Sequence, residues 1–129
     1  MTLDSRAVPT PTAHHLATFL RGPLLVWAGP LTRANRPERI VGAYHLLVSW
    51  RDPTLELVMH GPAVERHVAA TVDRFAHELT LTKAWIAPDP DQEMVEAFTA
   101  FATLIVTPDD LPDVGAATLA DALWSVLRG

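Results

Sequence analysis

Four short apolar runs, each closed by glycine or proline, constrain the fold of this chain more than any other feature of its sequence. The runs cover residues 24–28, 55–59, 81–86 and 104–106. Continuous apolar runs between turn-forming residues are typical of strands that are buried on both faces of a parallel sheet. Between and after these runs, apolar residues recur every three or four positions, which is the spacing of a helix with one buried face. This spacing predicts helices over residues 37–50, 62–79, 92–102 and 116–127.

The predicted elements therefore alternate strictly between strand and helix. Such alternation predicts an α/β fold, here a three-layer α/β/α, Rossmann-like domain around a four-stranded parallel sheet. Right-handed crossovers leave two strand orders open, 3-2-1-4 and 2-1-3-4, and we favour the first. Residues 1–22 are predicted to form an arm that contains a short helix over 14–21. Residues 23–129 are predicted to form a single domain of ordinary size.

Composition excludes several classes of function. Fifteen acidic against ten basic residues give a net charge of −5, so we expect no nucleic-acid partner, because binding to phosphates requires a basic surface. The absence of cysteine excludes disulfides, thiol catalysis and cysteine-ligated zinc. No apolar run approaches the roughly twenty residues that span a bilayer, and no signal peptide is recognisable. We therefore expect a cytoplasmic protein without a membrane span.

The candidate binding site follows from the predicted sheet. In such sheets a ligand lies beyond the carboxyl ends of the strands, where the strand order reverses, which for 3-2-1-4 is between the first and fourth strands. The helix that begins near Pro37 would direct its positive dipole end there, and two nearby arginines would favour an anion or nucleotide. The predicted ligand-binding residues are Gly29, Arg33, Asn35, Arg36, His60, Gly61 and Asp109.

Several specific chemistries find no support in the residues. The loop after the first strand has one glycine and no Walker lysine, which argues against dinucleotide and P-loop sites. His67 and His77 are ten positions apart on one predicted helix, too far for an i, i+4 metal pair. We therefore predict no catalytic residue, no metal site and no cofactor.

The order of segments over residues 23–108 resembles the C-terminal, donor-binding domain of GT-B glycosyltransferases of the group 1, or family-four, type. The resemblance rests on a strand that ends at Gly29 and on Pro37-Glu38-Arg39-Ile40-Val41-Gly42-Ala43-Tyr44, which is similar to the family's Pro-(Asp/Glu)-x-(Leu/Ile)-(Ile/Val)-x-Ala-(Phe/Tyr). It also rests on His60-Gly61-Pro62, which looks like the family's Gly-x-Gly-Pro turn, and on Val106-Thr107-Pro108, which looks like its Val-x-Pro strand end. The resemblance implies a Rossmann-like domain that binds a nucleotide sugar.

The departures from the family imply that catalysis is lost. Pro30 stands where the family has an arginine, and Asn35 stands where it has a lysine; both cations normally meet the donor's diphosphate. The family's Glu-x7-Glu element is missing after Pro108. We therefore expect a stand-alone glycosyltransferase-like domain that acts as a binding or assembly module. One alternative is a nucleotide-sugar or sugar-phosphate binding subunit that completes a transferase with a separate acceptor-domain protein. A second alternative is a small hydrolase or transferase that uses His60 and Asp109.

The end of the chain predicts self-association. The two further strands that follow the fourth strand in the family are missing, so strand Leu104–Val106 is predicted to lie at an open edge of the sheet. The last helix has more apolar residues than a four-stranded sheet requires. We therefore predict a homodimer through this strand and the side chains of Leu119, Leu123, Trp124 and Leu127.

Overall fold

The structure is a computed structural model, and it describes residues 22–128. The short helix predicted over 14–21 lies outside these residues. The described elements, in chain order, are β1 (Leu24–Ala28), the 3-10 helix η1 (Arg33–Asn35), α2 (Glu38–Trp50), β2 (Glu56–Gly61), α3 (Arg66–Glu78), β3 (Ala84–Pro88), α4 (Gln92–Phe101), β4 (Leu104–Val106), the 3-10 helix η2 (Pro108–Asp110) and α5 (Ala116–Leu127).

The four strands form one parallel sheet in the order β3-β2-β1-β4. The predicted order 3-2-1-4 is confirmed, and the order 2-1-3-4 is wrong. Val26 of β1 lies opposite Val58 of β2 and Ile105 of β4, so β1 is paired on both sides. The predicted edge position of β4 is also confirmed.

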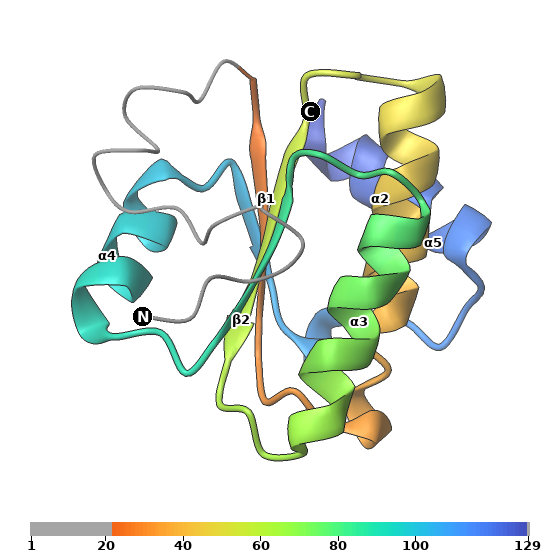
Figure 1. Ribbon diagram of the computed structural model, residues 1–129. Coiled ribbons are helices and arrows are strands. Elements are labelled where there is room, and N and C mark those ends of the chain that lie inside the picture. The colour runs from red at the N-terminus through yellow and green to blue at the C-terminus, as the bar shows by residue number, and fades with distance from the viewer. Residues whose placement is uncertain (1–21, 129) are drawn as a thin grey trace.

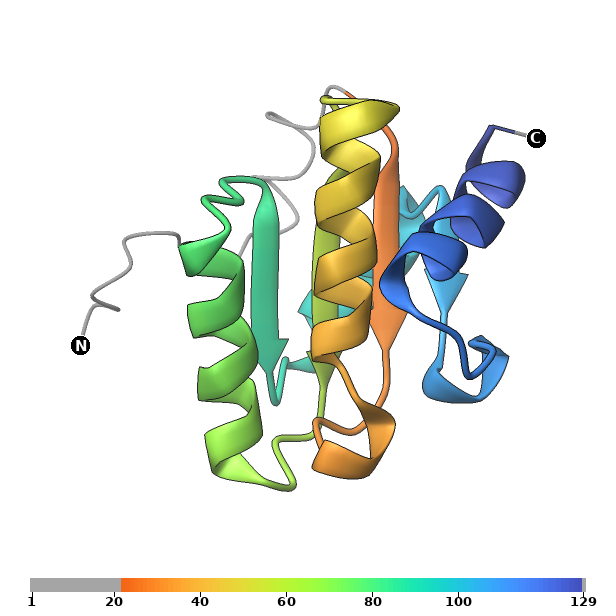
Figure 2. The ribbon, with the colours of Figure 1, turned by 90° about the vertical axis from the view of Figure 1, so that its right-hand side faces the viewer.

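Helices cover both faces of the sheet, as predicted for a three-layer fold. Figures 1 and 2 show α2, α3 and α5 on one face and α4 on the other. Alternate residues of β1 enter the two halves of the core: Leu25 and Trp27 pack in the cluster with α2, α3 and α5, whereas Val26 packs in the cluster with Phe98 of α4. β1 can therefore be apolar throughout, because it has no solvent-facing side.

Tyr44 joins α2 to the start of two strands. Its hydroxyl donates to the Leu55 carbonyl oxygen at 2.7 Å and to the Lys83 carbonyl oxygen at 3.3 Å. Burial raises the pKa of Tyr44 well above its ordinary value, and the negative charge of the buried Glu56 raises it further. The hydroxyl therefore stays protonated and acts as a donor.

The predicted limits of α3, β3 and β2 differ from the structure, and hydrogen bonds account for the starts of α3 and β3. Helix α3 begins at Arg66 and not at Pro62: the Pro62 carbonyl accepts from the Leu31 amide at 2.9 Å, which keeps the preceding loop extended. Strand β3 covers Ala84–Pro88 and not 81–86, because the Leu81 amide donates to the Ala76 carbonyl at 3.1 Å and completes the end of α3. β2 likewise continues to Gly61, two residues beyond its predicted end.

No helix within residues 22–128 has both the length and the apolar character that crossing a bilayer requires.

Candidate functional site

A cavity of about 440 Å³ lies at the carboxyl ends of β1, β2 and β3, on the side of the sheet that α4 covers. Parallel strands bring these ends to one edge of the sheet, and α4 supplies a wall. Its volume falls in the range of small-molecule sites. The lining residues are Gly29, His60, Gly61, Pro62, Asp89, Pro90 and Val95.

Backbone hydrogen bonds hold the floor of this cavity together. The Gly29 amide donates to the His60 carbonyl oxygen at 3.0 Å, and the Asp89 amide donates to the Gly61 carbonyl oxygen at 2.9 Å. Gly61 lies so close to β1 that a Cβ there would collide with the Gly29 carbonyl oxygen. The three strand ends are therefore fixed against one another, with no side chain between Gly29 and Gly61.

His60 is the most buried polar side chain of the lining, with 8% of the residue exposed. Its ring stacks on that of Phe98 in α4, with 5.4 Å between the ring centroids and an interplanar angle of 28°. Within residues 22–128, neither ring nitrogen has a hydrogen-bond partner. Burial lowers the pKa of His60 below its ordinary value, which favours the neutral ring. His60 can therefore offer a ligand in the cavity one donor and one acceptor.

Asp89 is the only charged residue of the lining, and it was not among the predicted site residues. It adopts a left-handed backbone conformation with φ 50°, which Asp tolerates better than most residues. Its Oδ1 accepts from the Ala63 amide at 2.9 Å, so the carboxylate is held against the loop after β2. Its position directly after the third strand is the signal that could have identified it.

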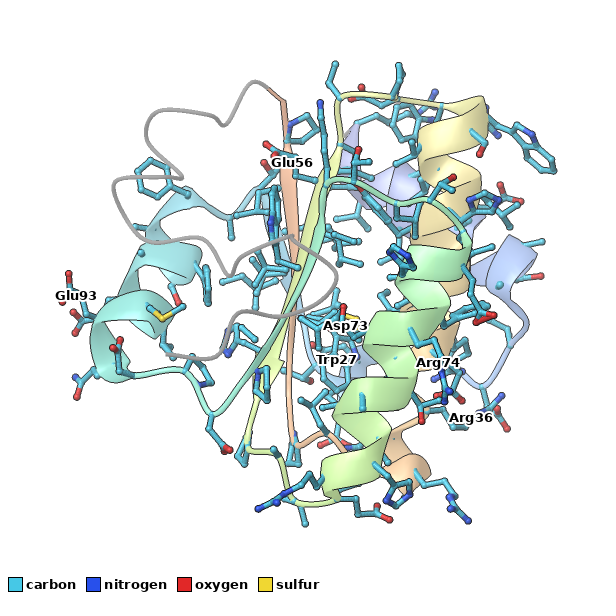
Figure 3. All side chains as sticks on the ribbon, viewed as in Figure 1. Trp27, Arg36, Glu56, Asp73, Arg74 and Glu93 are labelled. Carbon is cyan, nitrogen blue, oxygen red and sulfur yellow. The ribbon has the colours of Figure 1, made fainter. Side chains whose placement is uncertain are left out.

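The predicted residues of the loop after β1 lie outside this cavity and already have partners. The Arg33 amide donates to Oε2 of Glu65 at 2.8 Å, and Asn35 Nδ2 donates to the Pro30 carbonyl at 2.7 Å. Arg36 pairs with Asp113 in the loop before α5. Figure 3 shows Arg36 on the α2 side of the sheet, far from the labelled Glu93 of α4. Of the two arginine side chains in this loop, Arg36 is therefore paired with a carboxylate of the chain, whereas the guanidinium of Arg33 contacts Nε2 of His67 at 3.4 Å.

The predicted location between the first and fourth strands does not coincide with this cavity. A Cβ at Gly29 would lie 2.6 Å from Cδ of Pro108, so the proline ring packs directly against the end of β1 at this point. Asp109 follows Pro108 in η2, is exposed and does not line the cavity. Of the predicted binding residues, the structure brings Gly29, His60 and Gly61 together and leaves Arg33, Asn35, Arg36 and Asp109 outside.

No group of three potential metal ligands occurs among the described residues 22–128. Comparisons with protein-family models and with curated proteins find no match for this chain.

Proposed function

We propose that this chain is a small-molecule binding module whose site is the cavity around His60. One observation carries the proposal: a polar ring that is more than nine-tenths buried lines a cavity of about 440 Å³, and its nitrogens have no partner within residues 22–128. The ring nitrogens of His60 are not among the fully buried unpaired side-chain atoms of the described residues, so they are accessible from the cavity, where a ligand can bond to them. The location, at the carboxyl edge of a parallel sheet, is where ligands of this fold class bind.

The proposed role is binding without catalysis, in keeping with the first expectation from the sequence. Among the described residues, the lining has no hydroxyl, thiol or amine side chain that could act as a nucleophile. Asp89, the one acid of the lining, already uses Oδ1 to hold the Ala63 amide. No hydrogen bond joins His60 to an acid within the described chain, so the arrangement lacks an oriented base.

The finer alternatives that come from the glycosyltransferase resemblance receive no specific support from the site. A nucleotide-sugar subunit that works with a separate acceptor-domain protein would need free cations at the cavity, yet Arg36 is paired with Asp113, and neither Arg33 nor Arg36 lines the cavity. A hydrolase or transferase that uses His60 with Asp109 would need both at one cavity, and only His60 lines it. A glycosyltransferase-like origin of the module therefore remains a proposal that rests on the sequence.

A blocking experiment tests the binding proposal. A panel of neutral, cationic and anionic ring compounds, with UDP and GDP included, is screened by thermal shift and by ligand-observed NMR. A ligand that binds only the folded chain raises its stability.

We expect at least one compound to bind the wild type. Val95→Trp should abolish this binding because it fills the cavity, and Val64→Trp should leave the binding intact. Val64 is an exposed apolar residue outside the lining and makes a matched control. Absence of any binding, or binding that survives Val95→Trp, contradicts the proposal.

A further inference from the structure

The segment on the β3 and α4 side of the His60 cavity carries charges of one sign. The segment that runs from β3 through α4 contains four acids and, between residues 84 and 102, no lysine, arginine or histidine. These acids are Asp89, Asp91, Glu93 and Glu96. Within residues 22–128, the lining contains no lysine or arginine. Over distances shorter than the Debye length of about 8 Å, such a surface attracts cations and repels phosphate groups.

Of these four acids, Asp89 is the one that lines the cavity. The Asp89 amide is anchored on the Gly61 carbonyl and its Oδ1 on the Ala63 amide, each at 2.9 Å. Its other oxygen, Oδ2, has no hydrogen-bond partner within residues 22–128. By contrast, Asp91 uses its side chain to cap α4 at the Met94 amide, and Glu93 points away from the sheet in Figure 3. Asp89 is therefore an oriented negative charge with one acceptor position open.

The rest of the lining is apolar or neutral. Pro62, Pro90 and Val95 are apolar side chains around the cavity, and the neutral ring of His60 does not compensate the charge of Asp89. The cavity thus combines one fixed anion, a buried neutral donor–acceptor ring and apolar walls. A complementary ligand carries one positive charge on an apolar body.

We propose that the His60 cavity binds an organic amine in its protonated form. Its ammonium group donates to Oδ2 of Asp89, its apolar body lies against Pro62, Pro90 and Val95, and a ring nitrogen of His60 accepts a further N–H. This inference rests on the proposed binding function and adds the class of ligand. It predicts a preference opposite to that of a nucleotide site, because a phosphate would place a second negative charge beside Asp89.

Three probes of nearly equal shape test this assignment: 2-phenylethylamine, 2-phenylethanol and 3-phenylpropionate. Their binding to the full chain is measured by NMR titration, which resolves dissociation constants in the millimolar range, equivalent to about −4 kcal/mol. Both probes would donate to the Asp89 carboxylate, but only the ammonium adds the attraction of opposite charges, so we expect the amine to bind roughly tenfold more tightly than the alcohol. We expect the carboxylate to bind more weakly than the alcohol.

Asp89→Asn is the decisive variant. Asn can still accept from the Ala63 amide and tolerates the left-handed backbone, so the fold is retained while the charge is lost. We expect amine and alcohol to bind this variant equally. Glu93→Gln makes the same change of charge outside the lining and should keep the preference for the amine.

Wild-type binding of amine and alcohol with equal affinity, or an equal loss of preference in both variants, overturns the amine assignment but leaves the cavity as a binding site. If none of the three probes binds, the amine assignment is wrong, and the wider panel with Val95→Trp decides the binding proposal separately.

Discussion

Gly61 shows how strictly a single residue can be fixed by its neighbours at the floor of the cavity. A Cβ at this position would collide with the carbonyl oxygen of Gly29, which is part of the backbone and cannot rotate away. We predict that Gly61→Ala lowers the free energy of unfolding by about 2–3 kcal/mol, as expected for overpacking at a rigid site. Urea denaturation measures the change. Gly115→Ala is the matched control, because a Cβ at Gly115 meets nothing within 4 Å; an equal loss in both variants would refute the steric explanation.

His60 should make the stability of the chain depend on pH. Burial lowers the pKa of its ring in the folded chain, although the negative Asp89 lines the same cavity. In the unfolded chain the ring titrates near its ordinary pKa of about 6.5. Below that pH the unfolded chain binds a proton that the folded chain does not, so the free energy of unfolding falls as the pH decreases.

We therefore predict a loss of stability from pH 7 to pH 5 that is smaller in His60→Gln than in the wild type. Urea denaturation at several pH values measures it, and NMR titration of the His60 imidazole protons should show a pKa below the ordinary value for histidine. Parallel pH profiles of the two proteins would contradict the assignment of this effect to His60.

At the scale of elements, Arg39 of α2 holds the loop that leads into α5. Its Nη1 donates to the carbonyl oxygens of Pro112 at 2.7 Å and Val114 at 3.4 Å, and only 11% of its side chain is exposed. Arg36 also reaches this loop, but through an ion pair with Asp113 in which both side chains are largely in solvent. Hydrogen bonds from a buried charged donor should therefore contribute more than the surface ion pair.

We predict that Arg39→Met lowers the free energy of unfolding by about 2 kcal/mol, since it keeps the alkyl stem and removes the donors. Arg36→Met should cost less than about 1 kcal/mol. Both are measured by urea denaturation. The reverse ranking of the two variants would show that the ion pair, and not the buried donors, anchors the loop.

The limits of an element could be predicted where residues at its own ends mark them. They could not be predicted where a hydrogen bond to a distant segment sets them. β1, β4 and α5 have the predicted limits because glycine, proline or polar residues stand directly at their ends. Asp91 caps α4 as predicted, since its oxygen accepts from the Met94 amide three positions on. The start of α3 depends on the hydrogen bond between Leu31 and Pro62, which no local pattern contains, whereas the bond from Leu81 to Ala76 that delays β3 is a local one at the end of α3.

The same distinction explains the candidate site. Gly29, His60 and Gly61 could be predicted because the carboxyl ends of parallel strands converge. Asp89 was missed because the third strand was predicted to stop at residue 86, which left Asp89 in a turn; the strand in fact continues to Pro88. The pairing of Arg36 with Asp113 joins residues far apart in the sequence, so the loss of its free charge could not be predicted.

For the whole molecule, the sequence predicts a homodimer, but the side chains predicted to form its interface pack within their own chain. Leu119 and Leu123 are buried within their own chain, and Trp124 and Leu127 pack against the same core, so these side chains do not form a free apolar face. The exposed apolar residues near the sheet edge are instead Ile105, which is 41% exposed, and Phe101, which is 37% exposed. An edge strand without charge or proline is suited to pairing with a second copy.

We predict a two-fold dimer through β4, with Ile105→Lys giving a monomer because a charge on the edge strand opposes pairing. Light scattering at about 100 micromolar, well above the micromolar range of weak association, measures the mass. Val64→Lys places the same charge on an exposed apolar residue away from the sheet edge and should leave the dimer intact. A wild-type monomer at this concentration would refute the prediction.

The central place of β1 also determines the order in which the chain can complete its core during synthesis. β1 ends at Ala28, yet one of its two partners, β4, begins only at Leu104 and is therefore made much later. At about 5–20 residues per second, the β4 side of β1 waits several seconds for its neighbour. Leu24, Leu25, Val26 and Trp27 are all fully buried in the finished fold, so the waiting strand exposes an apolar, hydrogen-bonding edge. A nascent chain that stops before Leu104 is therefore a substrate for chaperones and not a smaller version of the domain.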